Sequence, residues 1–178
     1  MKKVAIIIAY KDFKDEEYFI PRKIFEDAGA EIKVISNKSG IARGADGGEV
    51  KVDIKLDELN VSEFDAVVFI GGPGALDNLD NEDSYKIAKD AISQNKILAA
   101  ICISPTILAR AGVLNGKKVT VWTSTLNKEP KEILENNGAQ YQAQDVVVDG
   151  NIITANGPEA AEKFGQEIIH MLSTEAEN

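Results

Sequence analysis

Short apolar runs alternate with amphipathic stretches along almost the whole chain. Most of the runs are continuous and rich in β-branched residues, as expected of strands that are buried on both faces of a sheet. The strands predicted in this way are residues 3–10, 30–37, 64–70, 96–102 and 117–123. Because a helical pattern follows most of them, we expect a mostly parallel sheet with helices on both faces.

The helical stretches are recognised by their spacing and by the residues that bound them. Residues 15–29 place apolar side chains at helical spacing and end at Gly29, a natural C-cap, while Pro21 predicts a kink in the first turn. The apolar positions of that helix are Ile20, Ile24 and Ala28. Further helices are predicted over residues 82–95, 104–114 and 127–139, and a last one starts near Pro158 and buries Ala161, Phe164, Ile168 and Leu172.

Two stretches differ from this alternation of strand and helix. Residues 48–59 alternate apolar and polar positions, which is typical of a half-exposed strand or hairpin at a sheet edge. Residues 144–154 consist of two short apolar runs joined by Asp149-Gly150, a strong signal for a β-hairpin.

Length and charge narrow the class of protein. The 178 residues suit one domain, predicted to cover residues 1–173, with a polar tail at 174–178. Hydrophobic residues make up 44% of the chain and charged residues 28%, which is ordinary for a globular protein. The net charge of −9 disfavours nucleic acid and anionic membranes as partners, because both attract basic surfaces.

Targeting signals and metal-ligand patterns are not evident. No apolar run approaches the length that spans a bilayer, and the N-terminal run is followed at once by charged residues, so we expect a cytoplasmic protein. The single cysteine excludes an internal disulfide and a multi-cysteine metal site, and no pattern of side chains supports zinc or iron binding. We therefore expect no metal.

The single cysteine, Cys102, stands where an apolar run ends and a helical pattern begins. A tight turn between strand and helix strains the connecting residue and exposes its side chain. The free N–H groups of a helix that begins near Ser104 and Pro105 would favour a thiolate and lower the pKa of the thiol. The alternative is that Cys102 is a small buried hydrophobic residue.

Two further stretches are candidates for a site at the carboxyl ends of the strands. The double glycine in "FIGGPGALDN" lets the backbone approach a ligand oxyanion, or forms a plain turn. One of the acids Asp15, Glu16 and Glu17 acts as an acid or base, or all three are a solvated first helical turn. The only histidine, His170, is expected far from these stretches, so a Cys-His pair is implausible.

These stretches together resemble the ThiJ/PfpI superfamily, which is related to the class I glutamine amidotransferases. The resemblance covers nearly the whole chain and is carried by "EEYFIP", "FIGGPGALDNL" and "AAICISPTILARAGVLNGKKVT". It implies a flavodoxin-like three-layer α/β sandwich with a nucleophile elbow at Cys102. It also implies a homodimer, or a higher oligomer built from dimers.

The resemblance also assigns roles to particular residues. It implies that Glu17, four residues before Pro21, is the carboxyl beside the thiol of Cys102, with Glu16 as the partner if the helix starts differently. It implies an oxyanion pocket at the backbone N–H groups of Gly72 and Ile103, with Gly71 beside them. Trp122 and Pro158 are the residues that we expect to line the pocket, although Trp122 also reads as a packing residue at the end of a strand.

The sequence departs from the family at two positions. Relatives carry a histidine either directly after the cysteine or at the end of the following strand, and here Ile103 and Trp122 occupy these places. Peptide hydrolysis needs a base for the thiol and an acid for the leaving amine, so the departures weigh against a peptidase or amidase.

Three functions are therefore considered. The first is a cofactor-free glyoxalase or deglycase that uses Cys102 and Glu17 on methylglyoxal-type dicarbonyls, small carbonyl substrates that accept a thiolate without expelling a leaving group. The second is a non-catalytic, redox-responsive protein in which Cys102 is oxidised. The third is an intracellular peptidase or amidase, with the base supplied by a neighbouring subunit.

Overall fold

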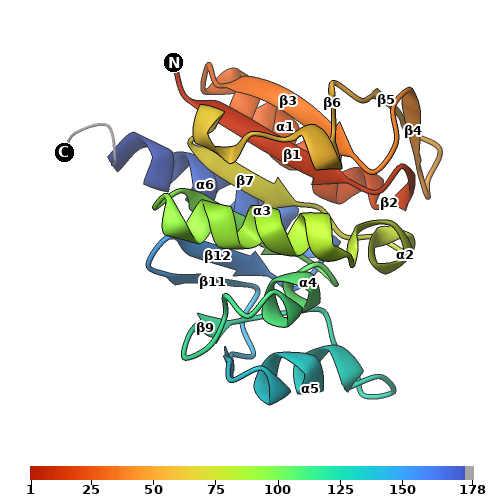
Figure 1. The fold of residues 1–178 in the computed structure, drawn as a ribbon. Coiled ribbons are helices and arrows are strands. Elements are labelled where there is room, and N and C mark those ends of the chain that lie inside the picture. The colour runs from red at the N-terminus through yellow and green to blue at the C-terminus, as the bar shows by residue number, and fades with distance from the viewer. Residues whose placement is uncertain (175–178) are drawn as a thin grey trace.

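The computed structural model describes residues 1–174 and contains one large sheet and two small ones (Figure 1). The strands are β1 (Lys3–Ile8), β2 (Lys11–Phe13), β3 (Glu31–Ser36), β4 (Ile41–Gly44), β5 (Glu49–Lys51), β6 (Ile54–Lys55), β7 (Ala66–Phe69), β8 (Ile97–Ile101), β9 (Lys118–Val119), β10 (Gln140–Tyr141), β11 (Val146–Asp149) and β12 (Ile152–Ala155). The helices are α1 (Asp15–Asp27), α2 (Ala75–Leu79), α3 (Glu82–Ser93), α4 (Pro105–Arg110), α5 (Glu129–Asn136) and α6 (Ala161–Thr174).

The large sheet has the strand order β11-β12-β8-β7-β1-β3-β6. All its neighbouring strands run parallel except the hairpin of β11 and β12, which turns at Asp149 and Gly150 as the sequence predicts. The chain builds the sheet outward from β1 in one direction and then resumes at β7 in the other. In such sheets, ligands bind at the carboxyl ends of the strands near this reversal.

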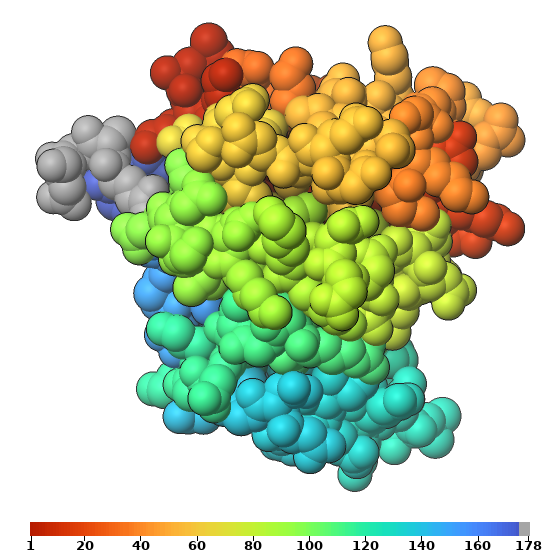
Figure 2. All heavy atoms as spheres, in the orientation of Figure 1, coloured from red at the N-terminus to blue at the C-terminus, as the bar shows by residue number. Residues whose placement is uncertain are grey.

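Helices cover both faces of the sheet, so the predicted flavodoxin-like sandwich is confirmed. On one face, α1 and α6 pack on the inward side chains of β1, β7 and β8, and Phe25, Phe164 and Ile168 fill this layer. On the other face, α3 and α4 pack on Ile7 and Phe69. Figure 1 shows α3 in front of the sheet, and Figure 2 shows the same side as a continuous surface that ends below in α5.

Several local predictions need correction. α1 passes through Pro21 without interruption, and it buries Glu17, Tyr18, Pro21 and Phe25, whereas Ile20 and Ala28 face outward. The strand predicted over 117–123 is reduced to β9, because Thr120 and Val121 pass beside the sheet as buried loop residues. The alternating residues 48–59 contribute β5 to a small sheet with β4 and β2, and β6 to the edge of the large sheet.

The two ends of the chain complete the fold. Gly29 ends α1 with a φ of +76°, as expected of a glycine C-cap. α6 buries Ala161, Phe164, Ile168 and Leu172, as predicted, and continues to Thr174. Of the predicted polar tail, residues 175–178 lie outside the described residues. No helix within residues 1–174 is long and apolar enough to cross a membrane.

Candidate active site

Cys102 occupies the turn between β8 and α4, in a left-handed backbone conformation with a φ of +64°. Two backbone hydrogen bonds hold it: its N–H donates to the Ala155 carbonyl at 2.9 Å, and its carbonyl accepts from the Trp122 N–H at 2.8 Å. Within residues 1–174, the other non-glycine residues with positive φ are Asp12 and Asn95, which are residue types that tolerate this region. Cysteine is not such a type, so the elbow (residues 102–104) stores backbone strain.

Two backbone N–H groups face the sulfur of Cys102. They belong to Ile103, the next residue of the elbow, and to Gly72 in the glycine turn (residues 71–74) that follows β7, and both lower the pKa of the thiol. Neither N–H donates to another acceptor within residues 1–174. The pair forms a small site for negative charge on the sulfur or on an oxygen bonded to its adduct.

Glu17 reaches the same place from the first turn of α1. Its carboxyl is fully buried, and Oε2 accepts a hydrogen bond of 2.9 Å from the N–H of Gly71. Oε1 has no hydrogen-bond partner within residues 1–174, although the carboxyl lies close enough to the thiol of Cys102 for the thiol to lower the pKa of Glu17. A buried carboxyl oxygen without a strong partner is costly, and such atoms are rare outside functional sites.

The glycines of the turn are required by these close contacts. A Cβ on Gly71 would stand 2.7 Å from both the Cβ of Cys102 and Oε2 of Glu17. Gly72 has a φ of +122°, and a Cβ there would stand 2.3 Å from the backbone nitrogen of Lys14. Only glycine therefore lets the end of β7 fit between the elbow and α1.

Burial sets the protonation of the acid and the thiol. It raises the pKa of Glu17 from 4.5 to about 7, against the lowering effects of Cys102, the Gly71 N–H and Lys14. Burial also raises the pKa of Cys102, and an ionised Glu17 raises it further. The two groups therefore compete for charge: near pH 7 about half of the Glu17 carboxyls are ionised, while the Cys102 thiol is protonated.

The pKa of Cys102 corrects one expectation from the sequence. The start of α4 was expected to lower this pKa through several free N–H groups, but α4 has only six residues. The N–H of Ser104 donates to Ile101, that of Thr106 donates to Ile103, and Pro105 has none. The single N–H of Ile103 remains for the sulfur, and it does not offset burial.

The thiol opens into a pocket of about 540 Å³. Its lining is mostly apolar and consists of Lys14, Glu17, Gly72, Pro73, Leu76, Asp77, Cys102, Ile103, Trp122 and Pro158. Trp122 is 37% exposed and, with Pro158 and Lys14, separates this pocket from a neighbouring one of about 440 Å³. The structure thus places Cys102, Glu17 and the other residues that the resemblance nominated at one pocket, except Gly71, which lies against Cys102 and Glu17 without lining it.

Comparison with known proteins shows which family the chain belongs to. Residues 2–171 match the family described as DJ-1/PfpI. The chain belongs to this family. The chain shares 40% identity over 168 residues with the uncharacterized protein MJ0967 of Methanocaldococcus jannaschii, covering 94% of the chain and 80% of that protein.

Other relatives in the DJ-1/PfpI family carry functional names. The chain is 32% identical to deglycase PfpI of Pyrococcus furiosus, covering 94% and 98% of the two chains. It is 33% identical to the putative cysteine protease YraA of Bacillus subtilis, covering 96% and 98%. The crystal structure of a ThiJ/PfpI domain protein from Brachyspira murdochii superimposes with a TM-score of 0.91 at 34% identity, covering 97% and 96%.

The three acids at the start of α1 have separate places within this family fold. Glu17 is buried at the thiol, whereas Glu16 is exposed and lines the neighbouring pocket. Asp15 accepts hydrogen bonds from the N–H groups of Asp46 and Gly48 and so holds the loop after β4 against α1. α1 begins at Asp15, as the alignment of Glu17 four residues before Pro21 requires, and Glu17 is the acid beside Cys102.

Two residues near the thiol were not anticipated from the sequence. Lys14, directly before α1, pairs with Asp46 at 2.7 Å and is the one cationic side chain that lines the Cys102 pocket within residues 1–174. Ser104, in the elbow, donates a buried hydrogen bond to the Ile70 carbonyl.

His170 is exposed on α6 and does not line the pocket of Cys102.

Proposed function

We propose that this protein is a cysteine-dependent, cofactor-free enzyme of the glyoxalase or deglycase type that acts on methylglyoxal-like dicarbonyls. The observation that carries this proposal is the buried carboxyl of Glu17, with its raised pKa, placed against the only thiol of the chain. The name of the relative deglycase PfpI supports the same class of reaction. A group with a pKa near 7 both takes and returns a proton at neutral pH, which suits carbonyl isomerisation.

The first step forms a carbon–sulfur bond. The carboxylate of Glu17 takes the proton of the Cys102 thiol, and the resulting thiolate attacks the aldehyde carbon of the dicarbonyl. The electron pair of the C=O bond moves to oxygen, which lies at the N–H groups of Gly72 and Ile103. The oxyanion then takes the proton from Glu17, which gives a hemithioacetal.

The second step moves a proton between neighbouring carbons. Glu17, again a carboxylate, removes the hydrogen from the former aldehyde carbon, and the electron pair of that C–H bond forms an enediolate with its charge on the neighbouring oxygen. The hydroxyl proton of the first carbon passes to this oxygen, and the same carboxyl returns its proton to the second carbon, which leaves a thioester of a 2-hydroxy acid on Cys102. Because Glu17 is fully buried, this proton does not exchange freely with bulk water.

Water completes the reaction. It attacks the thioester carbonyl, whose oxygen again rests on the two N–H groups, and the carbon–sulfur bond breaks. The products are the 2-hydroxy acid, lactate in the case of methylglyoxal, and the free thiol. No redox partner enters, because one carbonyl carbon is oxidised while its neighbour is reduced.

The site fits peptide hydrolysis less well, although YraA is named a putative cysteine protease. An amide nitrogen leaves only when it is protonated, and peptidases commonly use a histidine for this step. Ile103 and Trp122 occupy the positions where a histidine was expected, and His170 is not part of the site. An aldehyde has no leaving group, so Glu17 suffices for its chemistry.

The test is lactate formation from methylglyoxal by the purified protein beside three variants. Cys102→Ser and Glu17→Gln should abolish the activity, whereas Glu16→Gln, which changes the neighbouring exposed acid, should retain it. If the wild type forms no more lactate than Cys102→Ser, this reaction is excluded. Rapid uptake of one peroxide oxygen by Cys102 without lactate formation would then support the redox-responsive function instead.

A further inference from the structure

The elbow and the glycine turn extend beyond the paired part of their strands. The parallel pairing of β7 and β8 ends at Phe69 and Ala100, and the next residues of each strand bond only to its other neighbour, Ile70 to β1 and Ile101 to β12. Gly72 and Ile103, whose N–H groups face the sulfur, lie three residues past those ends. Their relative placement therefore depends on contacts outside the sheet.

One side-chain hydrogen bond joins these two segments. The hydroxyl of Ser104 donates to the carbonyl of Ile70 at 2.7 Å, and both residues are fully buried. Within residues 1–174, no other side-chain hydrogen bond links the elbow to residues 70–74. The bond starts one residue after Ile103 and ends two residues before Gly72, so it spans the gap between the two N–H donors.

We propose that Ser104 is a positioning residue for this site: its hydroxyl fixes the separation of the Ile103 and Gly72 N–H groups around the sulfur of Cys102. The hydroxyl does not touch the substrate, because Ser104 is fully buried and does not line the pocket. The effect of this hydrogen bond on turnover rests on the proposed function. Its effect on the reactivity of the Cys102 thiol does not.

The structure offers a matched control in Ser36 at the end of β3. Its hydroxyl donates to the carbonyl of Ile8, also at 2.7 Å, and it is also fully buried. This second bond joins β3 to β1 and not the elbow to the glycine turn. Ser36→Ala and Ser104→Ala remove the same kind of bond, so they should lower the melting temperature by similar amounts.

The experiment measures the rate at which iodoacetamide alkylates Cys102 between pH 5 and pH 10. Because Cys102 is the only cysteine, the reaction reports a single thiol. Loss of one well-placed N–H donor to an anion should slow alkylation at pH 7 about tenfold in Ser104→Ala and move the profile to higher pH. Ser36→Ala should keep the wild-type profile, and Ser104→Thr, which retains a hydroxyl, should restore it.

Lactate formation gives the second readout. Ser104→Ala should lower kcat about tenfold or more, with a smaller change in KM, because the N–H pair acts on the developing oxyanion. If Ser104→Ala is too unstable to purify, Ser104→Gly provides the same deletion. A wild-type alkylation profile in the folded deletion variant overturns the proposal. Absence of lactate from the wild type overturns the proposed function alone, because the alkylation profile still tests Ser104.

Discussion

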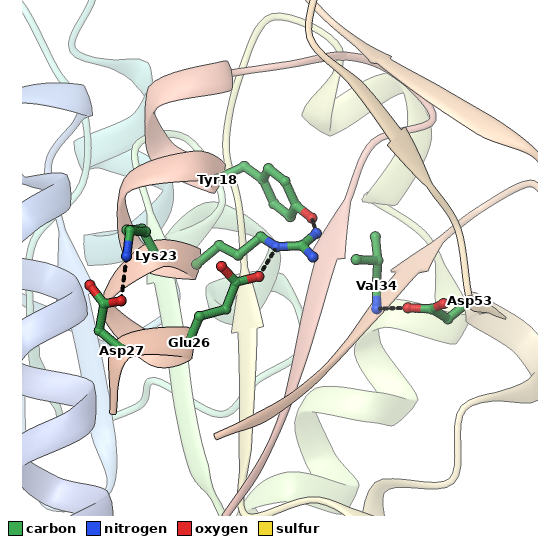
Figure 3. Close-up of polar contacts among 7 residues, drawn as sticks. Tyr18, Lys23, Glu26, Asp27, Val34 and Asp53 are labelled. Atoms are coloured by element: carbon green, nitrogen blue, oxygen red, sulfur yellow. Dashed lines mark hydrogen bonds and ion pairs between the residues drawn. The ribbon is translucent and has the colours of Figure 1, made fainter. Parts of the chain in front are cut away.

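The two sides of α1 place charged groups in opposite environments. On the outer side, Lys23 pairs with Asp27 and Arg22 with Glu26, one turn apart along the helix. Figure 3 labels Lys23, Asp27 and Glu26. On the inner side, Glu17 is fully buried. Exposed pairs contribute little to stability because water and salt screen them, whereas burial of one carboxyl shifts its pKa to about 7.

The exposed ion pairs of α1 and the buried Glu17 differ in what they require from the fold, because only the buried carboxyl loses its contact with water. The side chains of Lys23 and Asp27 are 68% and 62% exposed, so water can solvate both charges when the ion pair is broken. Glu17 has no such alternative, since its carboxyl is fully buried, with the Gly71 N–H and the Cys102 thiol beside it and the charge of Lys14 nearby. An acid retained in such a place indicates a use for its proton.

The largest expected difference between the two sides concerns catalysis. Since the proposed first step needs the carboxylate of Glu17, kcat/KM for methylglyoxal should rise with pH and level off above about 7. Glu17→Gln should lower kcat/KM about 10²- to 10⁴-fold and remove this rise. Glu26→Gln, on the outer side of the same helix, should keep the wild-type profile. A pH-dependent rise retained in Glu17→Gln would assign it to another group.

The next largest effect is on stability. Glu17 binds a proton more tightly in the folded protein, with its pKa at about 7, than in the unfolded chain at about 4.5. Its contribution to folding is therefore full below pH 4.5 and is lost as the pH rises to about 7, by up to about 3 kcal/mol. Urea unfolding of the wild type and Glu17→Gln at several pH values measures this change in the free energy of unfolding.

The two proteins should respond differently to pH. Glu17→Gln should gain stability relative to the wild type over this interval, and the difference should level off above it. A constant difference from pH 4 to pH 8 would mean that Glu17 titrates as an ordinary surface acid.

A smaller effect is expected at the elbow. Because Cys102 has a φ of +64°, glycine should fit this position better than alanine. Cys102→Gly should therefore be more stable than Cys102→Ala by about 1 kcal/mol in chemical denaturation. Equal stability of the two variants would show that the elbow relaxes when the thiol is removed.

The smallest effect belongs to the outer side of α1. Lys23→Ala removes one exposed ion pair and should change the free energy of unfolding by less than about 0.5 kcal/mol. The change should vanish in 1 M salt. A loss above 1 kcal/mol that persists in salt would show that these pairs are part of the framework that positions Glu17.

The sequence predicted the fold well because periodicity and turn residues are local signals. The runs that became β1, β7 and β8 are continuous, and Asp149-Gly150 sets its hairpin through its own backbone preferences. The short strands β2 and β4 were missed, since a few residues carry too little pattern. The hydrogen bond between Val34 and Asp53, drawn in Figure 3, is one of the tertiary contacts that no local pattern reveals.

The site was only partly predictable. Cys102, Glu17 and Gly72 were nominated from their motifs, but the burial of Glu17 depends on how α1 packs against β7 and α6. The pKa of Cys102 was expected to fall, and it rises because burial and a neighbouring carboxylate outweigh the N–H groups of Ile103 and Gly72. The hydrogen bond from Ser104 to Ile70 joins residues far apart in sequence, so the pattern of residues gave no sign of it.

The central claim is that Glu17 exchanges its proton near neutral pH while it is buried against Cys102. Infrared difference spectra of the wild type minus Glu17→Gln, recorded across pH, isolate the carboxyl stretch of this one side chain. We expect a protonated carboxyl band that disappears with a midpoint near pH 7. A midpoint near the ordinary value of 4.5 would contradict the proposed role of Glu17.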